Sequence, residues 1–146
     1  MYPEWWNSDI TIYNKYINPL TDLITWYKTQ ISGAFWKNIS NRVILGNTTL
    51  ETNSLICRIR KDEHFLPKQE WNQLPNDEMN DYFTLAEGDI VIKGFVDDNI
   101  DEYTQGNRSN DLINKYKSLG ECIVINEISL NDDDTRGLMH YSIKGL

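Results

Sequence analysis

Two clusters of acidic residues are the first candidates for chemistry in this sequence. One contains Asp97, Asp98, Asp101 and Glu102, and the other contains Asp132, Asp133 and Asp134. Carboxylate oxygens suit Ca²⁺, but a calcium loop of the EF-hand type also needs an oxygen ligand at its fifth position and a glutamate at its twelfth. Counted from Asp132, those positions hold Arg136 and Ile143, so the pattern fails. We expect solvated turns, with weak cation binding at Asp132–Asp134 as the alternative.

A catalytic centre would need a more specific pattern than the sequence offers. A glycosidase uses two carboxylates, but any acidic chain of this length contains such pairs. The sequence has no GxGxxG, P-loop, GxSxG or HExxH motif. His64 and His140 have neither metal-ligand spacing nor a nucleophile near them in sequence, so we expect them on the surface or on a strand face. We expect no enzyme, no catalytic residue, no metal and no cofactor.

Length, charge and cysteines limit the class of protein. The 146 residues fit one domain, and 40% hydrophobic with 12% aromatic residues is the composition of a folded chain. The net charge of −8 argues against a protein whose main task is binding phosphates, which relies on clustered lysine and arginine. Cys57 and Cys122 lie in apolar, strand-like segments, so we expect reduced core thiols rather than a disulfide or a metal site.

Neither end of the sequence predicts a membrane or secretory segment. The start, MYPEWWNSDI, has no basic region followed by an apolar run. No apolar run approaches the ~20 residues that span a bilayer. We expect a protein that is made and used without export through a secretory route.

Alternation of apolar and polar residues with period two predicts strands through most of the chain. Candidate strands lie at 9–16, in two parts of 23–36 separated by Gly33, and at 42–45, 54–60, 82–86, 89–95, 121–130 and 138–145. In 54–60, Leu55, Cys57 and Ile59 share the face expected in the core. The predicted fold class is mainly β: a small antiparallel β-barrel or sandwich of about seven to eight strands, since closure avoids exposed strand edges.

Two segments depart from this pattern. NRSNDLINKYKSLG predicts one late helix at 108–119, with Ser109 or Asn110 as its N-cap. The segment 61–81 is polar and rich in Pro and Asn, and an inserted loop of about 20 residues is often functional. We expect this loop to be mobile in the free subunit and to become ordered on assembly, either against a neighbouring subunit or across a central channel, with Phe65 and Trp71 as interface residues and Trp71 as the anchor.

Two further features concern the ends of strands. The turn before DIVIKGF predicts a corner with positive φ at Gly88.

Residues 1–8 form an N-terminal arm before the single domain of residues 9–146. Its Tyr2, Trp5 and Trp6 need a surface to bury against, and they either cap the barrel of their own chain or dock on a neighbouring subunit.

Five segments follow one another in an order that resembles the head–tail joining proteins of tailed phages. They are DITIYNKY, ITWYKTQISGAFW, SLICRIR, LAEGDIVIKG and CIVINEISLNDDDTRGLMHYSIKG, and together they cover 9–36, 53–60, 85–98 and 121–145. The last strand of that family carries His, an aromatic residue and Lys or Val near a final Gly; here these positions are His140, Tyr141, Ile143, Lys144 and Gly145. The sequence is most similar to a group of prophage proteins from Gram-positive hosts. The loop 61–81 and the YPEWW arm depart from the family pattern.

The resemblance implies a structural role in the virion, without catalysis or cofactor. Such proteins form a sixfold or twelvefold homo-oligomeric ring in the neck, between the portal–adaptor assembly and the tail, after assembly in the host cytoplasm. The ring closes the DNA channel and provides the tail attachment surface. Packaged double-stranded DNA passes without sequence-specific binding, and a wall that is not basic does not hold it by counterion release. No membrane is involved. In such a ring Asp97 and Asp98 would face a neighbour or the channel.

Two alternatives stay open. A tail-completion or tail-terminator protein uses the same kind of small β domain at the next ring along. A single-stranded nucleic-acid binder of the OB type would use the barrel to stack bases on aromatic residues, but it needs a basic groove among them. The aromatic segments here carry few cations.

Overall fold

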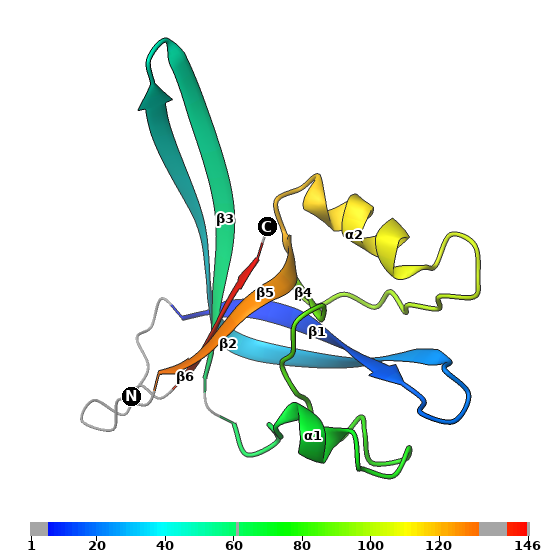
Figure 1. Cartoon of the computed structure of the whole chain (residues 1–146). Coiled ribbons are helices and arrows are strands. Elements are labelled where there is room, and N and C mark those ends of the chain that lie inside the picture. The colour runs from blue at the N-terminus through cyan, green and yellow to red at the C-terminus, as the bar shows by residue number, and fades with distance from the viewer. Residues whose placement is uncertain (1–5, 61, 132–139, 146) are drawn as a thin grey trace.

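The computed structural model describes residues 6–60, 62–131 and 140–145. In chain order the elements are β1 (Ser8–Ile17), β2 (Ile24–Leu45), β3 (Thr48–Arg60), α1 (Lys68–Trp71), β4 (Ile90–Lys93), α2 (Ser109–Lys117), β5 (Cys122–Asn131) and β6 (His140–Gly145) (Figure 1). The strands close into an antiparallel barrel in the order β1-β2-β3-β6-β5-β4. The predicted small, mainly β fold is confirmed, and between the two expected forms it is the barrel.

β2 is one strand of 22 residues where the sequence predicts three: two parts of 23–36 separated by Gly33, and 42–45. Its first part pairs with β1 and its second part pairs with β3, beginning at Phe35. Gly33 has φ of 77°, and the β1–β2 register shifts beside it, which marks a bulge where the strand changes partners. Gly33 therefore bends the strand without ending it.

The described residues form six strands rather than the expected seven to eight. Three predicted segments, the two parts of 23–36 and the segment 42–45, are joined in β2, because the chain stays extended through the bulge at Gly33. The segment 82–86 is not a strand, because its pairing is limited to an isolated bridge between Phe83 and Phe65. The predicted strands at 121–130 and 138–145 are present as β5 and β6, which pair with each other and bury Tyr141 and Ile143 on one face.

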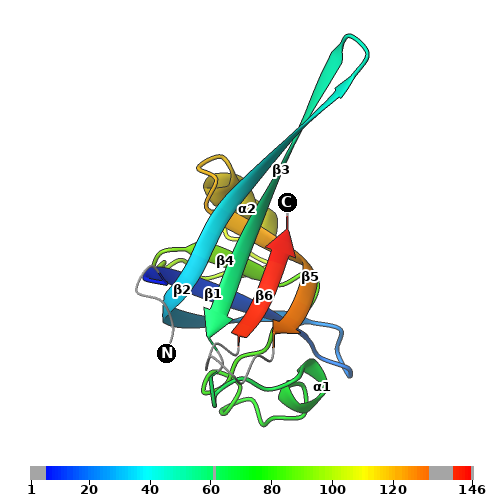
Figure 2. The same cartoon turned by 90° about the vertical axis from the view of Figure 1, so that its left-hand side faces the viewer.

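The far parts of β2 and β3 form a hairpin that projects from the barrel (Figure 2). Their pairing runs out to Leu45 opposite Thr48, and the two residues Gly46 and Asn47 make the turn. β6 pairs with β3 only from Leu55 to Arg60. Beyond Leu55, the described part of the chain supplies no third strand to this hairpin.

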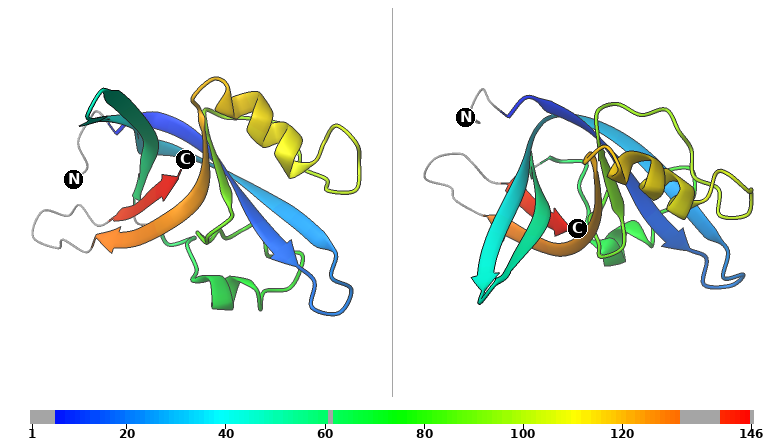
Figure 3. Two further views of the ribbon diagram at one scale, coloured as in Figure 1. Left: turned by 45° about the horizontal axis from the view of Figure 1, so that its top comes forward. Right: turned by 90° about the horizontal axis from the view of Figure 1, so that it is seen from above.

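Apolar clusters lie on both faces of β1. Ile10 and Ile12 belong to the main core, which also takes in Leu55, Cys57 and Ile59 of β3 as predicted. Tyr13, on the opposite face, belongs to a second cluster with Ile90, Ile92, Val96, Ile100, Leu112 and Cys122. α2 and the segment after β4 cover this second face, so both faces of β1 are buried (Figure 3).

α2 is the helix that the sequence predicts, but it is shorter than 108–119. Its N-cap is Arg108 rather than Ser109 or Asn110, because the Asp111 carboxylate accepts the Arg108 backbone N–H at 3.2 Å. Leu112 is buried and Tyr116 packs against the second cluster, whereas Leu119 lies beyond the helix and is exposed.

Cys57 and Cys122 are buried free thiols, as expected. Cys57 lies in the main core and Cys122 in the second cluster. Burial raises the pKa of both thiols, that of Cys122 to about 11, so both are protonated at neutral pH.

Candidate functional site

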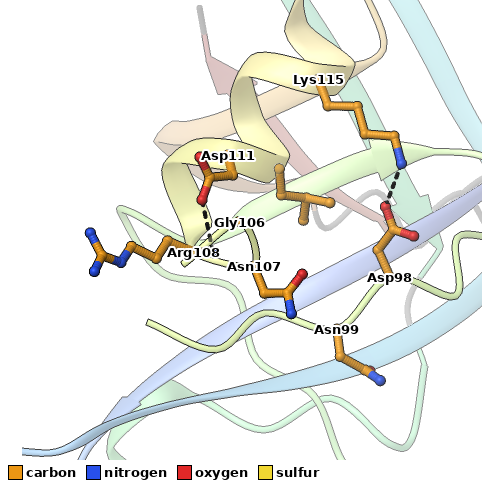
Figure 4. A pocket seen from close by; sticks show the side chains of 8 residues that line it. Asp98, Asn99, Gly106, Asn107, Arg108, Asp111 and Lys115 are labelled. Atoms are coloured by element: carbon orange, nitrogen blue, oxygen red, sulfur yellow. Dashed lines mark hydrogen bonds and ion pairs between the residues drawn. The ribbon is translucent and has the colours of Figure 1, made fainter. Parts of the chain in front are cut away.

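A polar pocket of about 410 Å³ lies between α2 and the segment that follows β4 (Figure 4). Its lining includes Asp98, Asn99, Asn107, Arg108, Asp111 and Lys115. The pocket therefore places Asp98, one acid of the first cluster, against the helix. The acids here either bind a ligand or hold segments of the chain together, and their hydrogen bonds decide between these two roles.

Asp98 is paired within the chain. Its Oδ2 accepts hydrogen bonds from Lys115 Nζ at 3.0 Å and from the Tyr116 hydroxyl at 3.2 Å. Its backbone carbonyl accepts the Tyr13 hydroxyl at 2.6 Å. The Lys115 hydrogen bond is the main cause that lowers the pKa of Asp98, so this carboxylate is ionised and its charge is balanced.

The neighbouring acids mostly serve turns. Asp97 is exposed, as the predicted solvated loop end requires, and its carbonyl accepts Lys28 Nζ at 3.0 Å. Asp101 accepts the Tyr103 N–H at 3.0 Å and the Thr104 hydroxyl at 2.8 Å, and the former bond lowers its pKa. These contacts fix the segment on the barrel and on α2, so the pocket is explained by chain-internal bonding.

No metal centre is built among the residues that the structure describes, since no three His, Cys, Asp or Glu side chains gather there. The acidic triplet Asp132–Asp134 lies outside the described residues. His64 is exposed and lies 2.8 Å from Asp62 within its own turn. His140 packs edge-on against the Trp6 ring, with ring centres 5.1 Å apart.

The corner at Gly88 is confirmed, with φ of 92°. The next residue, Asp89, is fully buried, a feature that the sequence analysis missed. It accepts hydrogen bonds from the Lys15 N–H at 3.0 Å, the Asn14 side-chain amide at 3.0 Å and the Ala86 N–H at 3.1 Å. Burial raises the pKa of this carboxyl. The sequence feature that could have indicated this buried carboxylate is an acidic residue directly before an apolar strand.

Trp71 does not lie where the sequence analysis expects it. Its side chain is 0% exposed and packs edge-on against the rings of Tyr16 and Tyr27, with centres 6.2 and 5.7 Å away. Its indole N–H points at the carbonyls of Met79 and Tyr82, at 3.3 Å each. Trp71 thus anchors the loop 61–81 to its own barrel, and its indole is not available to a neighbour in this conformation.

The other aromatic candidates are also used inside the chain. Phe65 packs on the main core, with its ring centre 4.2 Å from that of Tyr141. Trp6 is buried and lies near the ring of Phe35, with centres 6.0 Å apart. Trp6 therefore caps the barrel of its own chain, which is one of the two alternatives expected for the arm. Tyr2 and Trp5 lie outside the described residues.

Exposed apolar residues mark two surfaces that the sequence analysis did not single out. Ile17, Leu20 and Leu23 surround the turn between β1 and β2, which we call the hairpin tip. Ile128 and Leu130 lie on β5. Ile17 and Leu20 lie between two predicted strands, whereas Leu23, Ile128 and Leu130 lie within predicted strands, and the period alone did not show that these side chains are exposed.

Neither of the two helices in the described ranges is long and apolar enough to cross a membrane.

Among known proteins, no curated protein and no solved structure gives a significant match. One family matches over residues 5–146, which is nearly the whole sequence. The chain belongs to this family, DUF6751, which is described as a family of unknown function.

Proposed function

We propose that this protein is a structural component of the neck of a tailed bacteriophage. In this proposal, copies form a ring between the portal–adaptor assembly and the tail. The ring closes the DNA channel after packaging and offers the surface to which the tail attaches. The protein then acts by shape and by contacts between subunits, without catalysis.

The observation that carries this proposal is where the resembling segments lie in the fold. The segment 9–36 contains β1 and the first part of β2, and 53–60 is the barrel end of β3. The segment 85–98 contains the Gly88 corner and β4, and 121–145 contains β5 and β6. The resemblance therefore follows all six strands of one closed barrel, rather than scattered surface segments.

Charge supports the same role. The chain carries 22 acidic and 14 basic residues, which gives −8. Specific and non-specific DNA binding both depend on cations that displace counterions from phosphates. A neck ring must let DNA pass in both packaging and ejection, so a surface without a cationic excess suits it. The same charge disfavours the nucleic-acid binder, which a filter-binding assay at low salt tests directly.

Deletion of the gene from a phage that encodes it tests the proposal. We expect DNA-filled heads without tails, together with free tails of normal length, in electron micrographs of the lysate. Supplying the wild-type gene from a plasmid should restore tailed particles. Normal tailed particles from the deletion would overturn the proposal.

The same experiment separates the neighbouring role. A tail-terminator ring stops growth of the tail tube, so its loss gives tails of abnormal length. Free tails of uniform length favour the head-closure ring, and tails of variable length favour the terminator. A reconstruction of the neck would then show at which level the barrel lies.

A further inference from the structure

The outer face of the sheet formed by β2, β3 and β6 gathers cations in a chain that is acidic as a whole. Arg58 of β3 stands opposite Phe35 of β2 in the strand register, and two residues further out Ile56 stands opposite Lys37. Cys57, between Ile56 and Arg58, belongs to the main core, so these neighbours lie on the outside of the barrel. We call this surface the cationic face, and its residues are Phe35, Lys37, Ile56, Arg58, Ser142 and Lys144.

Two positive charges of the cationic face are not balanced within the described part of the chain. Glu127 of β5 stands directly opposite Lys144, so these two charges offset each other. Lys37 is exposed and Arg58 is half-buried. No carboxylate of the described residues forms an ion pair with either of them. A net positive surface therefore remains around Lys37 and Arg58.

Arg58 is positioned to receive an acidic group. Its guanidinium lies over the Phe35 ring, 5.3 Å from the ring centre. Its Nε is buried and has no hydrogen-bond acceptor among the residues that the structure describes. A guanidinium that rests on an aromatic ring and keeps unused N–H donors suits a carboxylate, because it can offer two parallel hydrogen bonds.

The segment that contains α1 has the opposite charge. Residues 62–81 hold one lysine, Lys68, against six acids, which are Asp62, Glu63, Glu70, Asp77, Glu78 and Asp81. Lys68 is used inside the chain, because its Nζ donates a hydrogen bond to the Lys15 carbonyl. All of the six acids except Asp62 are exposed. This segment is therefore an acidic surface that faces solvent.

Asp77 and Glu78 lie in a turn, residues 75–81, that is fixed to the barrel and that we call the acidic turn. The Glu78 N–H donates to the Pro75 carbonyl at 2.9 Å. The next residue, Met79, is 0% exposed, and its carbonyl lies 3.3 Å from the indole nitrogen of Trp71. The two carboxylates are thus offered in a fixed position, so docking them costs little further ordering of the backbone.

The cationic face and the acidic turn lie on different sides of the molecule. Figure 2 shows β2, β3 and β6 face-on, whereas the α1 segment lies below them, at one end of the barrel. Figure 1 shows the same segment beneath the barrel and away from the side that this sheet faces. Two complementary and different surfaces on one chain suit head-to-tail contacts, which close into rings when the rotation between copies allows it.

We infer that the acidic turn of one copy docks on the cationic face of a second copy. Glu78 binds the Arg58 guanidinium, and Asp77 approaches Lys37. The match of charge between two surfaces of the same chain identifies a second copy as the occupant. The contact also covers the cations and leaves an acidic outer surface, which suits a ring through which DNA passes.

This inference deepens the proposed neck ring and rests on it for the number of copies. Exposed ion pairs contribute little each, so a contact built on them is weak. The free chain should therefore be a monomer or a concentration-dependent mixture in light scattering, and the ring should form against the ring above it.

Engineered cysteines beside the charged residues test the contact directly. Ser142→Cys on the cationic face and Asn76→Cys in the acidic turn are made as separate proteins and mixed under mild oxidation. We expect a disulfide-linked dimer in the mixture and little in either protein alone. The yield should fall in concentrated salt, which screens the charges. The natural thiols Cys57 and Cys122 are buried, so unsubstituted protein should give no linked product.

Ser118→Cys is the matched control, because Ser118 is an exposed serine that follows Lys117 at the end of α2, in neither surface. Mixed with Asn76→Cys, it should link far less than Ser142→Cys does. Equal linking by the control would overturn the inference, since any serine beside a lysine would then suffice. Efficient linking of Ser142→Cys or Asn76→Cys with itself would overturn it in favour of a symmetric contact.

A charge exchange adds a second readout. Lys37 and Asp77 are both exposed, so their substitution should leave the melting temperature nearly unchanged. In the cysteine-bearing pair, Lys37→Glu or Asp77→Lys alone should lower the yield of linked dimer several-fold, and the two together should restore it. Equal yields from all four combinations would contradict the proposed pairing.

Two further outcomes would assign the surfaces differently. Binding of a short DNA duplex that Lys37→Glu abolishes, without linking between copies, would make the cationic face a nucleic-acid contact and overturn the inference. No linking in the purified pair, combined with neck rings of normal appearance in virions that carry Lys37→Glu, would show that the ring uses other surfaces. Both results leave the neck location intact, whereas normal tailed particles without the gene would remove the proposed function itself.

Discussion

The Asn14 side-chain amide donates a hydrogen bond to the buried Asp89 carboxylate at 3.0 Å and thereby ties β1 to the corner before β4. The same amide nitrogen donates to the Thr84 carbonyl, and the Thr84 N–H returns a bond to Asn14 Oδ1 at 3.3 Å. Asp89 receives two backbone N–H groups as well. This polar network joins segments 70 or more residues apart, at the place where the barrel closes.

Asp89→Asn should destabilise the protein by about 1–3 kcal/mol, because the new amide group sets a donor against the Asn14 amide or the Ala86 N–H and leaves them without an acceptor. Urea unfolding followed by tryptophan fluorescence measures this. Asp97→Asn is the matched control, since Asp97 is exposed, and it should change the free energy of unfolding by less than about 0.5 kcal/mol. Equal effects at both positions would contradict a structural role for the network.

Gly88→Val should lower stability by about 1–3 kcal/mol, because φ of 92° is costly for a β-branched residue. No heavy atom lies within 4 Å of an added Cβ, so the cost comes from the backbone alone. Gly88→Asn should therefore cost less than Gly88→Val, since asparagine tolerates positive φ better. An unchanged melting temperature for the valine variant would refute the argument.

Gly145→Ala tests steric overlap of an added side chain, rather than the backbone strain tested at Gly88. A Cβ here would overlap the Val124 carbonyl oxygen and lie 2.7 Å from a methyl group of Ile123. Backbone cannot move aside cheaply, so we expect a loss of about 1–3 kcal/mol by overpacking between β5 and β6. Gly145→Asn should be no milder than Gly145→Ala, in contrast to the order at Gly88. A neutral alanine variant would mean that β6 shifts freely.

Trp71→Ala should destabilise the protein by about 3–5 kcal/mol, because it removes a fully buried indole. The backbone N–H groups of Trp71 and Asn72, which donate to the Pro67 and Lys68 carbonyls, should exchange slowly in the free subunit. Leu20→Ala, at an exposed leucine, is the control and should leave stability nearly unchanged. Fast exchange at both amides in the wild type would restore the picture of a loop that is ordered only on assembly.

The Asp98–Lys115 pair should make stability depend on pH. The pKa of Asp98 is lowered in the folded chain, chiefly by the Lys115 hydrogen bond, so the unfolded chain takes up this proton first as the pH falls. The stabilisation is present above the ordinary pKa of an aspartate and is lost as the pH drops through the lowered folded value. Asp98→Asn should be slightly less stable than wild type at neutral pH, and the difference should vanish in acid. Unfolding curves across this pH range measure the difference in the free energy of unfolding between the two proteins. A difference that grows in acid would contradict a stabilising Asp98–Lys115 pair.

Local sequence patterns predicted those parts of the fold that depend on neighbouring residues. Period two placed Leu55, Cys57 and Ile59 in the core, and turn chemistry predicted the positive φ of Gly88. The strand count was too high because Gly33 could end a strand or bend it. Only the partner strands decide between these outcomes, and they come from distant parts of the chain.

The candidate site was less predictable because its contacts are long-range. Trp71 occurs in a polar segment, and its burial depends on Tyr16 and Tyr27 in β1 and β2, more than 40 residues earlier. The pairing of Asp98 with Lys115 likewise needs α2 to fold back over β4. Nothing in the period of either segment specifies these partners, so an aromatic residue expected at an interface proved to be an internal anchor.

The strand order has a consequence for synthesis. β6 lies between β3 and β5 in the barrel, and its ladder places Gly145 opposite Leu55. β1, β2 and β3 can pair as soon as they are made, but the other edge of β3 waits for β6, which the ribosome supplies about 80 residues later. During that interval the nascent chain exposes an unpaired strand edge and an uncovered core. Closure requires β6, so we expect it to follow the pairing of the earlier strands, and mutations that slow it should increase aggregation during expression more than they lower the stability of the purified protein.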